Sequence, residues 1–265
     1  MAGLRLMAVH AHPDDEASAT AGTMRLAADA GHRVVCVYAT NGDHGTLPTD
    51  LAEDETIVVR RRAEALASAD ILGTARVAWL DYADSGMTGW EQNGDEQSFH
   101  AADTDEAAAR LVAILDEEDA DAVVGYDWHG GYGHPDHVKV HHVVRRAVEL
   151  AARRPRYLET TMNRDHLRRL YLAAKEAGVA DEENWDPDRP ADDGNPIGTP
   201  EAELHWHVDA RPVLAAKRAA LACHASQEDV GWMLGMPEEQ YALVFGDEWF
   251  SEPQRPEGIL DALPF

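Results

Sequence analysis

The sequence predicts an α/β fold, a Rossmann-like and mostly parallel sheet with helices on both faces. Short apolar runs, typical of buried strands, alternate with longer Ala-rich segments that are typical of helices. Each of the first four apolar runs also ends in a cluster of polar residues. In open α/β sheets, ligands bind beyond the carboxyl ends of the strands. We therefore expect the active site at this edge of the sheet.

The first half of the chain supplies repeated strand–helix units. Residues 4–10 and 33–39 are largely apolar and predict two buried strands. Between them, the Ala-rich segment 17–30 predicts a helix, because Gly31 follows it and glycine commonly ends helices. The same reasoning predicts helices at 52–72 and 104–118, strands at 77–80 and 122–125, and a loop at 88–102.

The second half of the chain is expected to extend the sheet. Its segments predict helices at 135–153, 165–177 and 212–224 and strands at 156–160, 203–208 and 241–246. Residues 178–200 are acidic and rich in Pro and Gly, so we expect a surface excursion rather than a domain linker. We predict a single domain over residues 1–265, in which residues 201–265 complete the pocket.

Charge and composition exclude several classes of function. The formal net charge is −26, with 49 acidic and 23 basic residues, which argues against binding nucleic acid or an anionic membrane. The chain has no long apolar run and no signal-peptide pattern at its start, so we expect no membrane span and a cytoplasmic location. Cys36 and Cys223 lack metal-site spacing and predict buried thiols rather than a disulfide.

Two clusters of His and Asp mark the predicted edge of the sheet. The first is His12-Pro13-Asp14-Asp15, directly after the first strand, and the second is His134-Pro135-Asp136-His137, at the start of a helix. Polar residues also follow the second and third strands. Four polar strand ends that converge on one edge indicate a functional site more strongly than any one of them.

Three of these residues suit a divalent metal. A hydrolytic zinc site has three protein ligands and one open position. His12 and Asp15 are three residues apart in a turn, and His137 on the first turn of its helix is the third candidate. Two imidazoles and one carboxylate are compatible with Zn²⁺ and tolerable for Fe²⁺.

The remaining residues of the two clusters suit acid–base roles. A bound metal lowers the pKa of water toward about 7, so Asp14 suffices as the base near neutral pH. His134 is expected to face the substrate, and Asp136 to hold an imidazole in one tautomer. Two simpler interpretations remain open, since Asp14 could cap a helix and Asp136 could complement a helix dipole. Glu16 is expected only to start the helix.

The paired motifs resemble the PIG-L/LmbE-like family of deacetylases, in particular its mycothiol-pathway deacetylase and amidase branch. The resemblance covers nearly the whole chain and rests on the two His/Asp clusters and four further stretches. These are Arg61-Arg62-Ala63-Glu64, Asp84-Ser85-Gly86-Met87, Gly130-Gly131-Tyr132-Gly133 and residues 217–227.

The resemblance implies the same metal ligands and the same base as the residues themselves suggest. It also implies that His134 stabilises the oxyanion or acts as the acid, that Asp136 orients His134, and that Tyr132 contacts the substrate carbonyl. Arg61 and Asp84 match residues that grip sugar hydroxyls, which suits the chemistry of a guanidinium and a carboxylate. Alternatively, Arg61 pairs with Glu64 along a helix and Asp84 forms a turn.

The expected function is therefore a metal-dependent N-deacetylase, with Zn²⁺ or Fe²⁺, that releases acetate from a small molecule containing GlcNAc. One alternative is an amidase that cleaves a larger acyl group, such as that of a thiol S-conjugate. A second is a non-catalytic sugar-binding protein on the same fold. A nucleotide-binding Rossmann protein is disfavoured, because the first strand is not followed by a glycine-rich turn.

Overall fold

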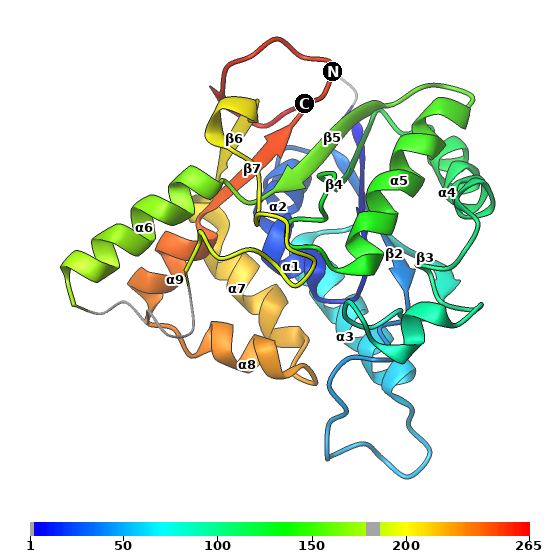
Figure 1. The fold of residues 1–265 in the computed structure, drawn as a ribbon. Helices are drawn as coiled ribbons and strands as arrows, with labels where there is room; N and C mark the ends of the chain where they lie inside the picture. The colour runs from blue at the N-terminus through cyan, green and yellow to red at the C-terminus, as the bar shows by residue number, and fades with distance from the viewer. Residues whose placement is uncertain (1–2, 179–185) are drawn as a thin grey trace.

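A computed structural model describes residues 3–178 and 186–265 and shows one central sheet flanked by helices (Figure 1). The described residues form an eight-stranded sheet with the order β3-β2-β1-β4-β5-β7-β6-β8. The strands are β1 (Arg5–His10), β2 (Arg33–Thr40), β3 (Arg76–Tyr82), β4 (Ala122–Tyr126), β5 (Arg156–Thr161), β6 (Trp206–Asp209), β7 (Asp247–Ser251) and β8 (Leu260–Asp261).

The sheet is mostly parallel, as the sequence predicts. Strands β3, β2, β1, β4 and β5 pair in parallel, whereas β7 runs antiparallel to both β5 and β6. Strand β1 lies between β2 and β4. The chain passes from β1 to β2 on one side and from β4 to β5 on the other, so the strand order reverses at β1. The carboxyl end of β1 is therefore the point at which ligands bind in such sheets. His12 and Asp15 follow directly after that end.

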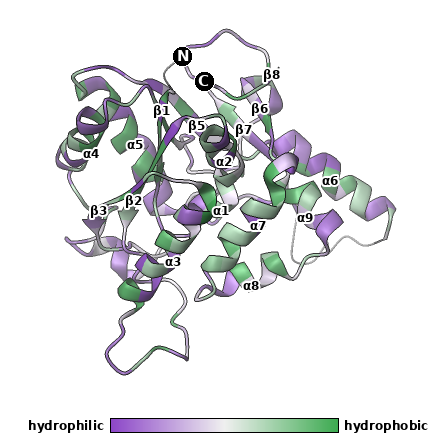
Figure 2. Ribbon diagram, turned by 180° about the vertical axis from the view of Figure 1, so that it is seen from behind, coloured by the Kyte–Doolittle hydropathy of each residue, from purple (hydrophilic) through white to green (hydrophobic). Residues whose placement is uncertain are grey.

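Helices cover both faces of the sheet, and the fold class is confirmed. The helices are α1 (Asp15–Ala19), α2 (Ala21–Asp29), α3 (Ile57–Leu72), α4 (Thr104–Glu118), α5 (Pro135–Leu150), α6 (Arg164–Glu176), α7 (Leu214–Cys223), α8 (Glu228–Leu234) and α9 (Glu238–Phe245). One apolar core joins the sheet to α2, α3 and α7, and another joins it to α4 and α5. Figure 2 shows hydrophilic and hydrophobic residues side by side on α3.

Among the differences from the sequence prediction, one concerns the type of an element and one its continuity. The run 241–246, expected to be a strand, is the end of helix α9, and the strand β7 begins only at Asp247. A short apolar run fits a strand and a buried helix equally, and here Tyr241 is the one residue of α9 that is buried. The helix expected over 17–30 is broken at Thr20, whose φ of −136° is not helical. The Thr20 hydroxyl contacts Nε2 of His10 at 2.8 Å.

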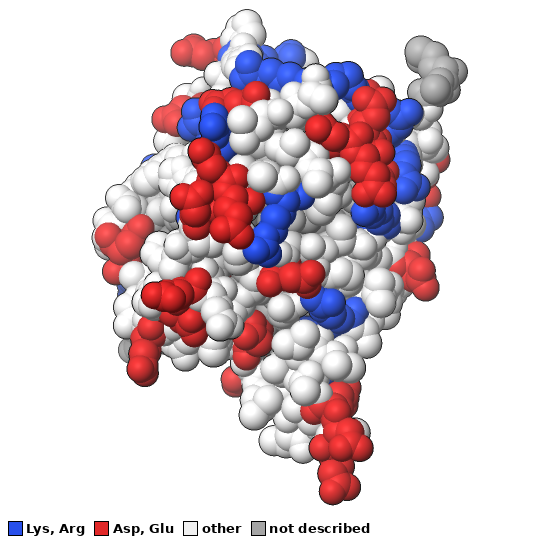
Figure 3. Space-filling model, turned by 90° about the vertical axis from the view of Figure 1, so that its right-hand side faces the viewer, with Lys and Arg blue, Asp and Glu red and all other residues white. Residues whose placement is uncertain are grey.

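Charged residues of both signs share the surface. On the face shown in Figure 3, basic side chains lie among acidic ones. Among the described residues, no helix is long and apolar enough to cross a membrane. Part of the expected surface excursion, residues 179–185, lies outside the described residues. Its later part contacts the turn before α5, where the Gly198 N–H donates to the Gly131 carbonyl at 2.7 Å.

Candidate active site

The turn after β1 presents the first cluster. Asp14 has a φ of 118°, which residues with side chains rarely adopt. This conformation turns the chain sharply into α1, so that the Asp15 N–H donates to the His12 carbonyl at 3.3 Å. The Asp15 carboxylate also accepts from the His12 backbone N–H at 2.8 Å. His12 and Asp15 are thus fixed on the same side of the turn.

A glycine-rich turn before α5 presents the second cluster. Gly130, Gly131 and Gly133 all have positive φ. A Cβ atom at Gly130 would lie 2.3 Å from the Cβ of His137, so only glycine fits this close approach. Pro135 occupies the first turn of α5, which suits its fixed φ and missing N–H. The turn thereby brings His134 and His137 against the end of β1.

His137 and His12 each direct one imidazole nitrogen at Asp15. Nδ1 of His137 lies 3.1 Å from the Gly130 carbonyl, an acceptor, so Nδ1 carries the proton. Its buried Nε2 has no hydrogen-bond donor within the described residues and lies 3.3 Å from Oδ1 of Asp15. Nε2 of His12 likewise faces the carboxylate of Asp136 and donates to it, which leaves Nδ1 3.4 Å from Oδ2 of Asp15.

Two imidazole nitrogens that face one carboxylate form a place that suits a cation. The donor set is two imidazoles and one carboxylate, so the residues present fit a divalent metal such as zinc. The electrostatic field of the site is consistent with a bound cation. Burial alone would lower the pKa of His12, but Asp84, Asp136 and Asp15 raise it well above its usual value. The surrounding acids therefore stabilise positive charge at this place.

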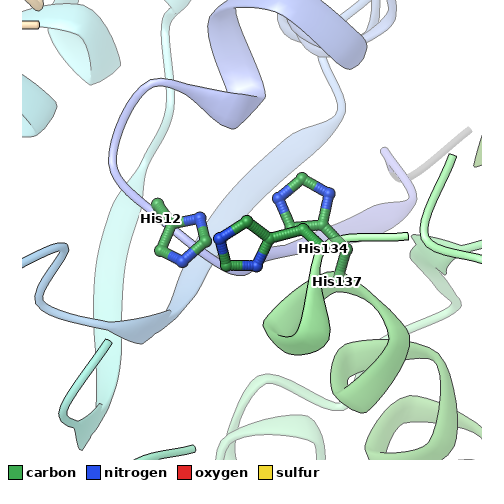
Figure 4. A group of neighbouring side chains, drawn as sticks. All are labelled: His12, His134 and His137. Carbon is green, nitrogen blue, oxygen red and sulfur yellow. The ribbon is translucent and has the colours of Figure 1, made fainter. Parts of the chain in front are cut away.

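His134 lies beside the other two imidazoles (Figure 4). Ring nitrogens of His12, His134 and His137 lie within 4.8 Å of one another. Nδ1 of His134 accepts the Asp136 backbone N–H at 3.1 Å and caps α5. Its proton therefore sits on Nε2. Burial, with repulsion from His12 and His137, lowers the pKa of His134 to about 2, so the ring is a neutral donor.

The carboxylate of Asp136 contacts His12 and not His134, the histidine that the resemblance implies it orients. Its Oδ2 accepts from Nε2 of His12 at 3.1 Å, and only its backbone N–H contacts His134. Ser85 completes this contact, because its N–H donates to Oδ2 at 2.9 Å and its hydroxyl bonds to Oδ1. Asp136 is fully buried. Ser85 was not among the residues expected from the sequence, although it follows Asp84 in a matched motif.

The Asp14 carboxylate turns to Arg61 instead of capping α1. Nη2 of Arg61 lies 2.7 Å from Oδ2 of Asp14 and also donates to the Pro13 carbonyl, while Nη1 donates to the Gly42 carbonyl at 2.8 Å. Burial raises the pKa of Asp14 to about 6, although Arg61 opposes the shift. A carboxylate of that pKa is well suited to accept a proton near neutral pH. Arg61 is thus paired with Asp14. The alternative helical pair with Glu64 does not form, since Glu64 accepts instead from Ser226.

A cavity of about 400 Å³ opens onto these residues. Asp84 is buried in its wall, accepts the Gly86 N–H at 2.8 Å, and lies 3.5 Å from Nε2 of His12. Tyr132, 39% exposed, lies between this cavity and a second one of about 210 Å³. Of the residues expected at the site, the larger cavity is lined by His12, Asp14, Asp15, Arg61, Asp84, Tyr132 and His134. His137 lines the smaller cavity, together with Asp15.

Glu16 differs from the sequence expectation. It lies in the first turn of α1, but it is only 1% exposed, and its Oε2 accepts the N–H of Asp14 at 3.0 Å. In the sequence, Glu16 is the third consecutive acid after the first strand, and this pattern could have indicated a role at the site. An acid at a helix start also complements the helix dipole, so the pattern has a second explanation.

The family is settled by comparison with known proteins. Residues 7–148 match the family model PIG-L, described as GlcNAc-PI de-N-acetylase. The chain belongs to the PIG-L family. A relative from Streptomyces griseus, 1D-myo-inositol 2-acetamido-2-deoxy-alpha-D-glucopyranoside deacetylase, is 35% identical over 98% of this chain and 89% of its own length.

Solved structures show the same fold. The N,N'-diacetylchitobiose deacetylase of Pyrococcus horikoshii matches with a TM-score of 0.59 and 21% identity, over 93% of this chain and 82% of its own. A 4-carboxy-2-hydroxymuconate hydratase, GalB of Pseudomonas putida, matches with a TM-score of 0.57 and 17% identity, over 98% and 99%. Because the PIG-L fold is shared by a deacetylase and a hydratase, the reaction has to be argued from the site.

Proposed function

We propose that this PIG-L protein is a metal-dependent N-deacetylase that removes the acetyl group from a small molecule containing GlcNAc. The observation that carries the proposal is the pair of imidazole nitrogens, from His12 and His137, that converge on Asp15 beside the Asp14 carboxylate. The deacetylase names of the relatives, at about 35% identity over most of the chain, support the same reaction.

His12, Asp15 and His137 would hold the metal, with zinc the first candidate and Fe²⁺ the second. When bound, a divalent ion lowers the pKa of water and polarises a carbonyl oxygen. Asp14 is then the base that takes a proton from the attacking water. Arg61 fixes the direction of the Asp14 carboxylate through the 2.7 Å ion pair.

His134 is assigned to the carbonyl oxygen of the substrate. Because its Nδ1 accepts a backbone N–H, the Nε2–H is free to donate to the oxygen as negative charge develops there. Tyr132, at the border of the two cavities, is positioned to contribute a second donor. Asp84 lies in the wall of the larger cavity and supplies an acceptor for a sugar hydroxyl.

The test is a hydrolysis assay on defined acetamido sugars. Metal-free protein is reconstituted with Zn²⁺, or with Fe²⁺ under anaerobic conditions, and acetate and free amine are measured. The substrates are GlcNAc linked to inositol, N,N'-diacetylchitobiose and GlcNAc itself. We expect equal amounts of acetate and amine from at least one of them, and none from the metal-free protein. Metal-loaded protein that binds these sugars without hydrolysing them would support the sugar-binding alternative instead.

One observation favours the amidase alternative. The smaller cavity, about 210 Å³, reaches Asp15 and His137 from the other side of Tyr132 and is lined by Met162, Leu167, Val244 and Phe245. An acyl group longer than acetyl would fit an apolar space of this kind. Substrates with acetyl, butyryl and hexanoyl groups on one amino sugar separate the two activities. A kcat/KM that rises with chain length favours the amidase, and one that falls favours the deacetylase.

A further inference from the structure

The backbone of Asp14 has an unfavourable conformation, and the residues assigned to the proposed reaction do not account for what stabilises it. Its φ of 118° lies in a region that is unfavourable for any residue with a Cβ atom. A strained conformation of this kind persists only where surrounding groups hold it. The Asp14 carbonyl accepts the Ala17 N–H at 3.0 Å, as expected at the start of a helix. The Asp14 N–H donates to Oε2 of Glu16 at 3.0 Å, which is less usual.

Glu16 is itself held from two sides. Its second oxygen, Oε1, accepts from the hydroxyl of Ser68 at 2.6 Å and faces Nε2 of His224 at 2.7 Å. Glu16 is 1% exposed and His224 is fully buried. Burying a carboxylate is costly unless it is paired and hydrogen-bonded, and both conditions are met here. The Glu16 side chain is therefore fixed in one orientation, with Oε2 directed at the Asp14 N–H.

His224 brings this support from a distant part of the chain. It directly follows α7, and the next residues are attached to α3 through Ser226, whose N–H and hydroxyl donate to Glu64 at 2.9 and 2.7 Å. Ser68 also lies on α3, as does Arg61. The strained turn is thus held on the carboxylate side by Arg61 of α3. On the backbone side it is held by Glu16, which Ser68 of α3 and His224 after α7 fix.

We propose that Glu16 and His224 form a positioning pair that holds the Asp14 backbone, and thereby the carboxylate, in the orientation needed by a base. This inference rests on the proposed function. Neither residue lines either cavity, so the pair acts on the reaction through Asp14 and not through contact with substrate. The pair is distinct from Arg61, which binds the carboxylate itself.

The geometry predicts a graded response to substitution. Glu16→Ala removes both acceptors, whereas Glu16→Gln retains one carbonyl oxygen but replaces the other with a donor. We expect kcat to fall about 10- to 100-fold in Glu16→Ala, as for a misplaced catalytic group, and less in Glu16→Gln. KM and the amount of bound metal should stay near their wild-type values. Glu159→Gln, in a buried carboxylate on β5 that accepts from Ser251 at 2.9 Å, is the matched control and should leave kcat unchanged.

The histidine provides a second pair of variants in case the Glu16 variants fail to fold. His224→Gln keeps a nitrogen donor near Oε1, whereas His224→Leu keeps volume and loses the donor. We expect His224→Gln to retain kcat within a few fold and His224→Leu to resemble Glu16→Ala. If folded, metal-loaded Glu16→Ala or His224→Leu has wild-type kcat, or if the loss simply follows lost metal, the inference is wrong.

A measurement without substrate separates this inference from the proposed function. Hydrogen exchange at the Asp14 amide, followed by NMR, should speed up at least tenfold in Glu16→Ala and stay at the wild-type rate in Glu159→Gln. If the wild type hydrolyses no acetamido sugar but the exchange rate changes as expected, the function is wrong and the support of Asp14 stands. If the wild type is active and exchange at Asp14 is unchanged, the positioning pair is refuted.

Discussion

Nε2 of His12 and Oδ2 of Asp136 lie 3.1 Å apart, although the two residues are separated by more than 120 positions in the chain. This contact joins the two His/Asp clusters. It fixes the tautomer of the neutral His12 ring, in which Nδ1 would present its lone pair toward Asp15 and a metal there. Hydrogen bonds of this kind to the free nitrogen of a ligating histidine orient the ring and raise its basicity. Asp136 therefore belongs to the metal site through His12.

The first prediction concerns metal affinity. Asp136→Asn should weaken binding of Zn²⁺ by about 10- to 100-fold, the usual effect of losing a partner of a ligating histidine. Ser85→Ala should have a smaller effect in the same direction, because the Ser85 N–H still reaches Oδ2. Ser98→Ala, in another buried serine, serves as the control. Affinity is measured by competition with a chelator. Unchanged affinity in Asp136→Asn, together with lost activity, would place the role of Asp136 on the substrate instead.

The second prediction concerns the base. Asp14→Asn removes proton acceptance but keeps the shape of the side chain, so kcat should fall by about 10²- to 10⁴-fold. Metal content should stay at the wild-type level, because the side chain of Asp14 faces Arg61. Metal analysis of the same sample accompanies the rate measurement. Wild-type turnover in metal-loaded Asp14→Asn would exclude Asp14 as the base.

The sequence was sufficient to predict the parallel part of the sheet and its active edge. Continuous apolar runs such as 33–39 have few alternatives to a buried strand, and parallel strands place their carboxyl ends together. The polar clusters after these strands therefore had to meet. The structure places His12, Asp15 and His137 together for this reason.

Contacts between side chains could not be predicted in the same way. Asp136 is next to His137 in sequence and two residues from His134, yet its carboxylate faces His12, because its side chain points toward β1 from the first turn of α5. Glu16 stands where an acid commonly starts a helix, but its partner His224 is 208 positions away in the chain. Local sequence gives the direction of neither side chain. The misassigned strand at 241–246 has a related cause, since a short apolar run carries no period that decides between helix and strand.

The third prediction tests a buried ion pair that packs α7 against the sheet. Nζ of Lys217 lies 2.5 Å from Oε1 of Glu248, and both side chains are 1% exposed. Glu248 also accepts the N–H groups of Gly22 and Thr23, both at 2.8 Å, at the start of α2. Lys217→Met leaves this carboxylate buried without its cation and should lower the free energy of unfolding by about 3–5 kcal/mol.

Urea denaturation measures the effect, and a double variant provides the control. Lys217→Met combined with Glu248→Gln removes both charges and should be less destabilised than the sum of the two single variants. Additive effects would mean that Lys217 and Glu248 contribute independently, and that the pair has no energetic coupling.

The last prediction concerns pH and the C-terminal strand. Both ring nitrogens of His207 face carboxylates, with Nε2 2.7 Å from Asp247 and Nδ1 2.8 Å from Asp261 on β8. Only the protonated ring can donate to both. The Asp247 carboxylate raises the pKa of His207; burial opposes the shift, and Asp261 adds to it. Within residues 3–178 and 186–265, Arg211, 2.6 Å from Asp247, and His166, 3.8 Å from it, are the other charged or titratable groups in contact with this carboxylate.

A folded-state pKa above the unfolded value of about 6.5 stabilises the protein at low pH. The stabilisation is complete below that unfolded pKa and is lost as pH rises through the folded pKa of His207. We therefore expect the thermal midpoint of the wild type to fall more steeply from pH 6 to pH 9 than that of His207→Gln. The comparison uses metal-free protein, because metal binding has its own pH dependence. The protection factor for hydrogen exchange at Ala262, whose N–H donates to the His207 carbonyl at 3.1 Å, should fall over the same range. If the thermal midpoints of the two proteins change equally with pH, protonation of His207 does not hold β8 on the sheet.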